Sequence, residues 1–160
     1  MSRLLIFLLI TMSIVSTAWA EEGKLIPEYQ IEGAGTGNMA TSLVQVTIIS
    51  KNKDFHEHEF GRCAIHGILF RGYSDANSSY TSSSHSAIMG SPMAEAQHAD
   101  FFKSFFDSMY AGYVQVQGDT RRVVKVGKEY KTSVTVAVSV SQLKKDLEKA
   151  GILKSLKSGW

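Results

Sequence analysis

The segment from Tyr130 to Val140 reads Tyr-Lys-Thr-Ser-Val-Thr-Val-Ala-Val-Ser-Val, and it decides the fold class. Successive side chains of a β-strand point to opposite faces, so valines at alternate positions would share one face. The opposite face would carry small and polar side chains, namely Lys131, Ser133, Thr135, Ala137 and Ser139. An antiparallel sheet tolerates one solvated face. We therefore predict an α+β fold, a mostly antiparallel sheet with helices packed on one face as an open sandwich.

Alternating apolar residues elsewhere predict further strands at Tyr29–Glu32, Ser42–Ser50, Ile68–Arg71, Tyr113–Gln117 and Val123–Val126. Apolar residues at helical spacing predict helices at Phe55–His66, Pro92–Met109 and Gln142–Ala150. The first helix should stop at Gly67, a common helix-ending residue, and Gly118-Asp119 should form a turn between strands. The second helix should place its phenylalanines against the valine face of the sheet. Residues 33–38 are rich in glycine but lead into a strand, which favours a turn over a nucleotide-binding loop.

The first twenty residues have the pattern of a secretory signal peptide. Arg3 supplies a positive charge, Leu4–Val15 is mostly apolar, and Ala18-Trp19-Ala20 has the small-x-small pattern of a cleavage site. This pattern predicts a signal peptide at residues 1–20 and one secreted α+β domain at residues 21–160. We expect a periplasmic or secreted protein with no transmembrane anchor in the mature chain, because no later segment is long and apolar enough to span a bilayer.

The charges are nearly balanced, with 17 Lys and Arg against 15 Asp and Glu. Nucleic-acid binding needs clustered basic residues, so no nucleic-acid partner is predicted. Residues 73–91 are rich in serine, which predicts a flexible loop within the domain.

Cys63 is the single cysteine, so the chain has no internal disulfide. A thiolate with an imidazole base can act as a nucleophile, and zinc also accepts Cys and His ligands, so His66 and His98 are candidate partners. A lone cysteine more commonly packs in a core as a small apolar residue. We therefore favour no catalytic residues, no metal and no cofactor, and keep Cys63, His66 and His98 as candidates.

Four segments carry a resemblance to a known group of proteins. They are Ala64–Tyr73, Glu95–Phe102, Val124–Lys131 and Leu143–Gly151. Together they resemble uncharacterised secreted proteins of the Bacteroidetes, a family of unknown function. More loosely, the predicted element order is similar to small envelope modules of curli-secretion and TolB-type periplasmic proteins. The resemblance implies export and brings no activity with it.

These observations predict a non-enzymatic periplasmic or secreted module that binds a protein or envelope component. The predicted binding residues lie on the polar sheet face, in the serine-rich loop and at the C-terminus: Ser133, Thr135, Ser139, Tyr80 and Trp160. A sheet face of small side chains is also suited to pairing with a second copy as a homodimer. The alternatives are a thiol-dependent enzyme using Cys63 with a histidine, and a metal-binding module.

Overall fold

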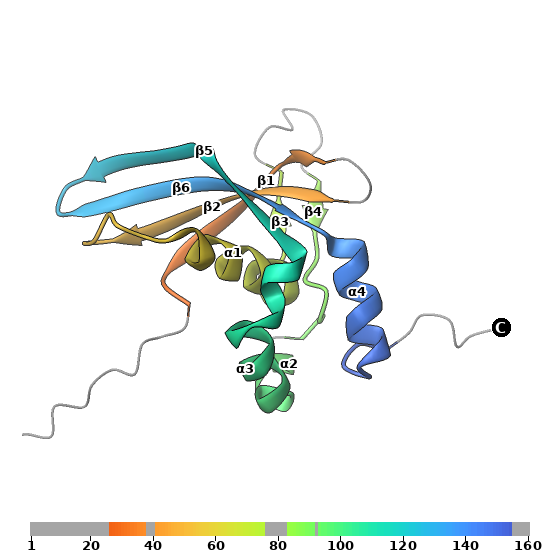
Figure 1. Ribbon diagram of the computed structural model, residues 1–160. Helices are drawn as coiled ribbons and strands as arrows, with labels where there is room; N and C mark the ends of the chain where they lie inside the picture. Colours follow the sequence, from red (N-terminus) through yellow and green to blue (C-terminus); the bar gives the residue numbers. More distant parts are fainter. Residues whose placement is uncertain (1–25, 38–40, 76–82, 92, 155–160) are drawn as a thin grey trace, which may run out of the picture.

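The computed structural model describes residues 26–37, 41–75, 83–91 and 93–154 (Figure 1). Its main layer is a four-stranded antiparallel sheet in the order β1-β2-β6-β5. These strands are β1 (Tyr29–Thr36), β2 (Ser42–Ser50), β5 (Val114–Val126) and β6 (Glu129–Val138). The helices are α1 (Glu57–His66), α2 (Ala94–Gln97), α3 (Ala99–Asp107) and α4 (Val140–Lys149), and they lie on one side of the sheet. The predicted α+β class is confirmed. The predicted signal peptide lies outside the described residues.

The central ladder joins β2 to β6, and its inner face is the valine face that the sequence predicts. Val134, Val136 and Val138 are buried, as are their neighbours on β2, Val44, Val46 and Ile48. The predicted strand runs two residues too far. The chain leaves the sheet at Ser139, whose backbone N–H donates to the Tyr113 carbonyl at 2.9 Å, and α4 begins at Val140.

The helix that packs directly on the valine face is α1, which contacts β2, β5 and β6. The predicted stop at Gly67 and the predicted strand after it are both wrong. Gly67 has helical dihedrals and continues into a π-helical turn, Gly67–Arg71. The glycine is needed for close packing, because a Cβ there would lie 2.7 Å from Ile31 Cδ1. The turn ends at Gly72, where φ is +74°.

The second predicted helix is broken into α2 and α3 at His98, whose dihedrals are not helical (φ −120°, ψ 36°). The layer next to the valine face is α1, and α3, which carries the phenylalanines, lies farther from the sheet (Figure 1). Their rings instead meet rings from the α1 side, with the Phe102 centroid 4.9 Å from that of Phe70 and the Phe106 centroid 6.1 Å from that of His66. A 3₁₀ turn, Met109–Tyr113, then leads into β5.

The predicted turn at Gly118-Asp119 is a bulge inside one long strand, β5, where the register shifts between Gln117 and Arg122. At this bulge the Thr120 side chain takes the place of a missing backbone partner. Its hydroxyl accepts a hydrogen bond from the Thr135 N–H at 2.8 Å and donates one to the Gln117 carbonyl at 2.7 Å. The hairpin turns instead at Gly127, where φ is +62°.

Two other segments are more regular than predicted. Gly33–Thr36 belong to β1 rather than to a turn. Within the serine-rich segment, two short strands pair with each other, β3 (Tyr73–Ser74) and β4 (Ser84–His85), while residues 76–82 lie outside the described part of the chain. Within the described residues, no helix has the length and apolar character needed to cross a membrane.

Candidate functional site

His66 joins three elements through a chain of polar side chains. It is the last residue of α1, and its Nδ1 lies 2.7 Å from the Tyr29 hydroxyl on β1. Its Nε2 lies 3.2 Å from Glu95 Oε2 on α2. The side chains of His66 and Glu95 are 14% and 44% exposed, so the chain of contacts runs from the core to the surface.

The two contacts together define the proton positions on a neutral imidazole. A carboxylate can only accept a hydrogen bond, so Nε2 carries the proton that is donated to Glu95. Nδ1 is then the acceptor, and the Tyr29 hydroxyl donates to it. Burial lowers the pKa of His66, while the neighbouring Glu95 carboxylate acts in the opposite direction. The net direction keeps the ring neutral at pH 7.

At the Tyr29 end of these hydrogen-bonded side chains, the hydroxyl is buried and has no access to a substrate. Tyr29 is 3% exposed, and burial raises its pKa well above the ordinary value for tyrosine. The Arg71 guanidinium lies over the Tyr29 ring, with its carbon 4.5 Å from the ring centroid, and donates to the Tyr29 carbonyl at 3.2 Å. A hydroxyl, an imidazole and a carboxylate in series can move a proton. Here the hydroxyl is buried, so the contacts serve to hold the imidazole and the carboxylate in position.

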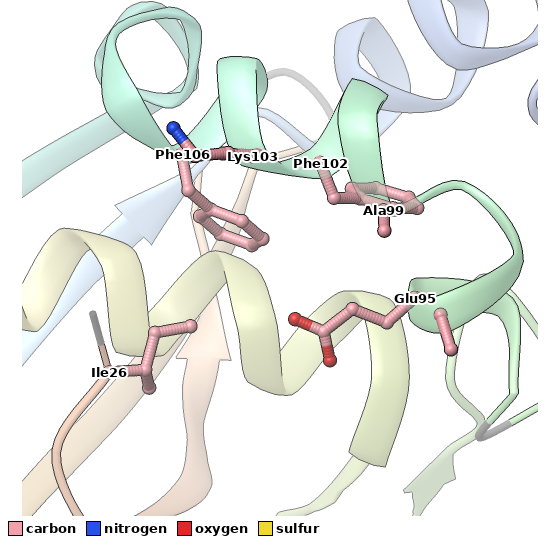
Figure 2. Close-up of a pocket in the computed structure, with 7 residues that line it drawn as sticks. Ile26, Glu95, Ala99, Phe102, Lys103 and Phe106 are labelled. Atoms are coloured by element: carbon pink, nitrogen blue, oxygen red, sulfur yellow. The ribbon is translucent and has the colours of Figure 1, made fainter. Parts of the chain in front are cut away.

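The Glu95 end opens into a cleft formed by two adjoining hollows. One has a volume of about 380 Å³ and is lined by Ile26, Glu95, Ala96, Ala99, Phe102, Lys103 and Phe106. The other, of about 480 Å³, shares Ile26 and Glu95 and adds Pro27, Glu28, Tyr29, His66 and Arg71. Figure 2 shows the Glu95 carboxylate pointing into the space between Ile26 and the rings of Phe102 and Phe106.

The thiol candidate, Cys63, is fully buried in the core. Burial, followed by the nearby Glu59 carboxylate, raises its pKa to about 12, so the group is a protonated thiol at neutral pH. The other candidate base, His98, sits at the break between α2 and α3, and its ring centroid is 6.5 Å from that of Phe102. Among the described residues, no group of three or more His, Cys, Asp or Glu side chains could hold a metal ion.

The predicted binding residues fall in different places. Ser133 lies on the open sheet face, where its hydroxyl is 2.9 Å from that of Thr47. Thr135 lines a shallow hollow of about 400 Å³ on the same face, together with Gln45, Asp119, Thr120, Arg121 and Arg122. Ser139 has left the sheet and precedes α4. Tyr80 and Trp160 lie outside the described residues.

The hairpin of β5 and β6 is a surface that the sequence patterns did not single out. Every residue from Arg121 to Glu129 is exposed, and Val123, Val124 and Val126 are 45%, 57% and 51% exposed. Between Arg121 and Lys131 the sequence carries five basic side chains and one acidic one. This local charge was visible in the sequence, but its exposure was not, because a valine-rich segment also predicts a buried strand.

The Tyr29–His66–Glu95 chain was missed for a different reason. Its members lie far apart in the sequence, and Glu95 is three residues before His98, which makes a pairing between those two look natural. The break at His98 instead leaves Glu95 beside His66.

A scan against protein-family models finds no match for this chain, and searches of the curated proteins and of the solved structures find no significant match.

Proposed function

We propose that this protein is a non-enzymatic periplasmic or secreted module that binds a partner protein along strand β5. The partner would supply an extended segment with acidic side chains. The observation that carries the proposal is the position of β5 at the edge of the sheet, where every residue of its outer half, from Arg121 to Val126, is exposed. The export part of the proposal rests on the signal-peptide pattern in residues 1–20.

The two edges of the sheet differ. At the β1 edge, Gly33 forms a bridge with Asp75, so β3 covers part of that strand. At the other edge, β5 pairs only with β6 among the described strands, and the end of the hairpin extends beyond α1 (Figure 1). An open edge strand can accept an added strand through its backbone N–H and C=O groups, and alternate side chains then select the partner.

The charge on this hairpin selects the kind of partner. Arg122 and Lys125 lie on β5 itself, with Lys128 in the turn and Lys131 on β6. Basic side chains on an edge strand disfavour pairing with an identical strand, because like charges would face one another. They favour a strand that places Glu or Asp opposite them. The exposed valines add apolar contact area between the charges.

The proposal can be tested by fluorescence anisotropy with labelled short peptides. Arg122 and Lys125 are three residues apart, so they lie on opposite faces of β5. A valine peptide with Glu at every third position can place a carboxylate opposite each of them, and this Glu-Val peptide should bind the mature chain. The matching Lys-Val peptide should not. Binding should weaken with added salt, because the contacts are exposed ion pairs. A Glu-Val peptide with all of its central backbone amides methylated should bind more weakly, since the amides that face β5 then have no N–H to donate.

The charge-reversal variant Arg122→Glu/Lys125→Glu should weaken binding of the Glu-Val peptide by about tenfold or more. The control is Lys144→Glu on α4, an exposed lysine away from the hairpin. If the peptides of opposite charge bind alike, or if methylation has no effect, binding along the β5 edge is wrong.

A further inference from the structure

We propose that the cleft at Glu95 binds a small organic cation, a primary ammonium group attached to a short apolar body. The ammonium would pair with the Glu95 carboxylate, and the body would lie against Ile26, Phe102 and Phe106. This ligand site is separate from the β5 edge, and the inference does not depend on the partner proposed there.

The carboxylate is preorganised for a cation. The His66 Nε2–H holds Glu95 Oε2 at 3.2 Å, and His66 is itself held by Tyr29, so the Glu95 side chain has a fixed direction before any ligand arrives. Preorganised groups bind more tightly because less conformational freedom is lost. Figure 2 shows that this direction is into the cleft.

The nearby cationic side chains have other partners. Lys103 Nζ is 3.6 Å from Asp107 Oδ2, one turn further along α3. Arg71 is held over the Tyr29 ring and by the Tyr29 carbonyl. The imidazole that does contact Glu95 is neutral at pH 7, so it orients the carboxylate without cancelling its charge. Glu28, which also lines the cleft, adds a second carboxylate that offsets the guanidinium charge of Arg71.

The walls around the carboxylate suit an apolar body. Phe102 and Phe106 are almost fully buried, so each presents only part of its ring to the cleft, while Ile26 forms the opposite wall. Aromatic faces attract an adjacent ammonium group as well as apolar atoms. Hollows of about 380 and 480 Å³ have room for a ligand with one ring or a short alkyl chain.

The test is an NMR titration of the ¹⁵N-labelled mature chain with 2-phenylethylammonium at millimolar concentrations. Amide shifts should cluster at residues 26–29, 66 and 95–106. The uncharged analogue 2-phenylethanol, which has the same shape, should bind about tenfold more weakly, because a hydrogen bond to a carboxylate is stronger when the donor is charged. The anion 3-phenylpropionate should not bind.

The variant Glu95→Gln removes the charge but keeps an oxygen that can accept from His66, so the fold should be retained. It should abolish the preference for the amine over the alcohol. Glu148→Gln, on the exposed side of α4, is the matched control and should leave that preference unchanged.

The inference is wrong if no shifts appear in the cleft, if the amine and the alcohol bind alike, or if Glu95→Gln binds the amine as the native chain does. The peptide titrations at β5 are independent of these results, because neither Arg122 nor Lys125 lines the cleft. Failure at one site therefore leaves the other proposal standing.

Discussion

The Cys63 side chain is completely buried among the core residues of α1, and its raised pKa of about 12 keeps it as a neutral thiol. We predict that iodoacetamide will not alkylate Cys63 in the folded protein near pH 8, because the thiolate is the reactive form. The unfolded chain in urea should react readily. Mass spectrometry of timed samples measures both rates, and rapid labelling of the folded chain would restore the thiol-enzyme alternative.

Thr132 is the one polar residue that is fully buried on the inner face of β6, and its hydroxyl has no hydrogen-bond partner among the described residues. A buried unpaired hydroxyl destabilises the folded state. Thr132→Val, which keeps the shape, should raise the free energy of unfolding by about 1 kcal/mol in urea titrations. The control Thr47→Val loses a hydrogen bond to Ser133 on the open face and should not stabilise the chain.

The lowered pKa of His66 makes folding stability depend on pH. Below about pH 6.5 the unfolded chain binds a proton at this position more readily than the folded chain does. The contribution of His66 is therefore complete above that pH and is lost as the pH falls toward the folded pKa. Urea midpoints from pH 7.5 to pH 5 should decline more steeply for the native chain than for His66→Gln. Parallel declines would contradict a buried, neutral imidazole.

At the scale of elements, apolar periodicity located the strands of the main sheet and the helical segments, although it joined α2 and α3 into one helix and divided β5 into two strands. It was insufficient where a glycine had two explanations. Gly67 looks like a helix stop, but the structure uses its missing Cβ to let α1 approach Ile31 closely. Gly118 looks like a turn, but Thr120 bridges the bulge and keeps β5 continuous. Both outcomes depend on contacts with distant strands, which no local pattern contains.

The helical segment formed by α1 and the π-helical turn ends at Gly72, and the conformation of Gly72 gives a prediction. Gly72 and Gly151 have nearly equal φ values of +74° and +72°. A Cβ at Gly72 would collide with the backbone carbonyl of His85, whereas a Cβ at Gly151 has no atom within 4 Å. Gly151→Ala should cost about 1 kcal/mol of stability and Gly72→Ala about 3 kcal/mol or more. Equal losses in thermal unfolding would show that φ alone decides the cost.

At the scale of the whole molecule, one hydrophobic cluster includes residues of the sheet, α1, α3 and α4. We therefore predict a single cooperative unfolding transition for a chain of residues 21–160. Far-UV circular dichroism reports the backbone, and near-UV signals report the tyrosines that pack in or against this cluster, Tyr29, Tyr73, Tyr110 and Tyr113. The two urea curves should coincide. Separate midpoints would mean that the helices and the sheet unfold independently.

The whole-molecule arrangement also explains which parts of the candidate sites were predictable. Ser133 and Thr135 were placed on the open face because strand alternation fixes the face of a residue. The His66–Glu95 contact depends on how α2 packs against α1. The exposure of Val124 arises because the hairpin of β5 and β6 extends beyond the helices. Those are properties of packing between elements, which the alternation of residues along one strand does not encode.

The pairing of β2 with β6 determines when the central sheet can form during synthesis. Residues 42–50 find their central partner only at residues 130–138, after all the helices except α4 have been made. A ladder between such distant segments closes slowly, since a long loop loses entropy before any contact is gained. During synthesis, the valine-rich face of β2 therefore lacks its partner strand β6 until the C-terminal quarter of the chain has been made. A chain interrupted before residue 130 has no way to complete its central sheet.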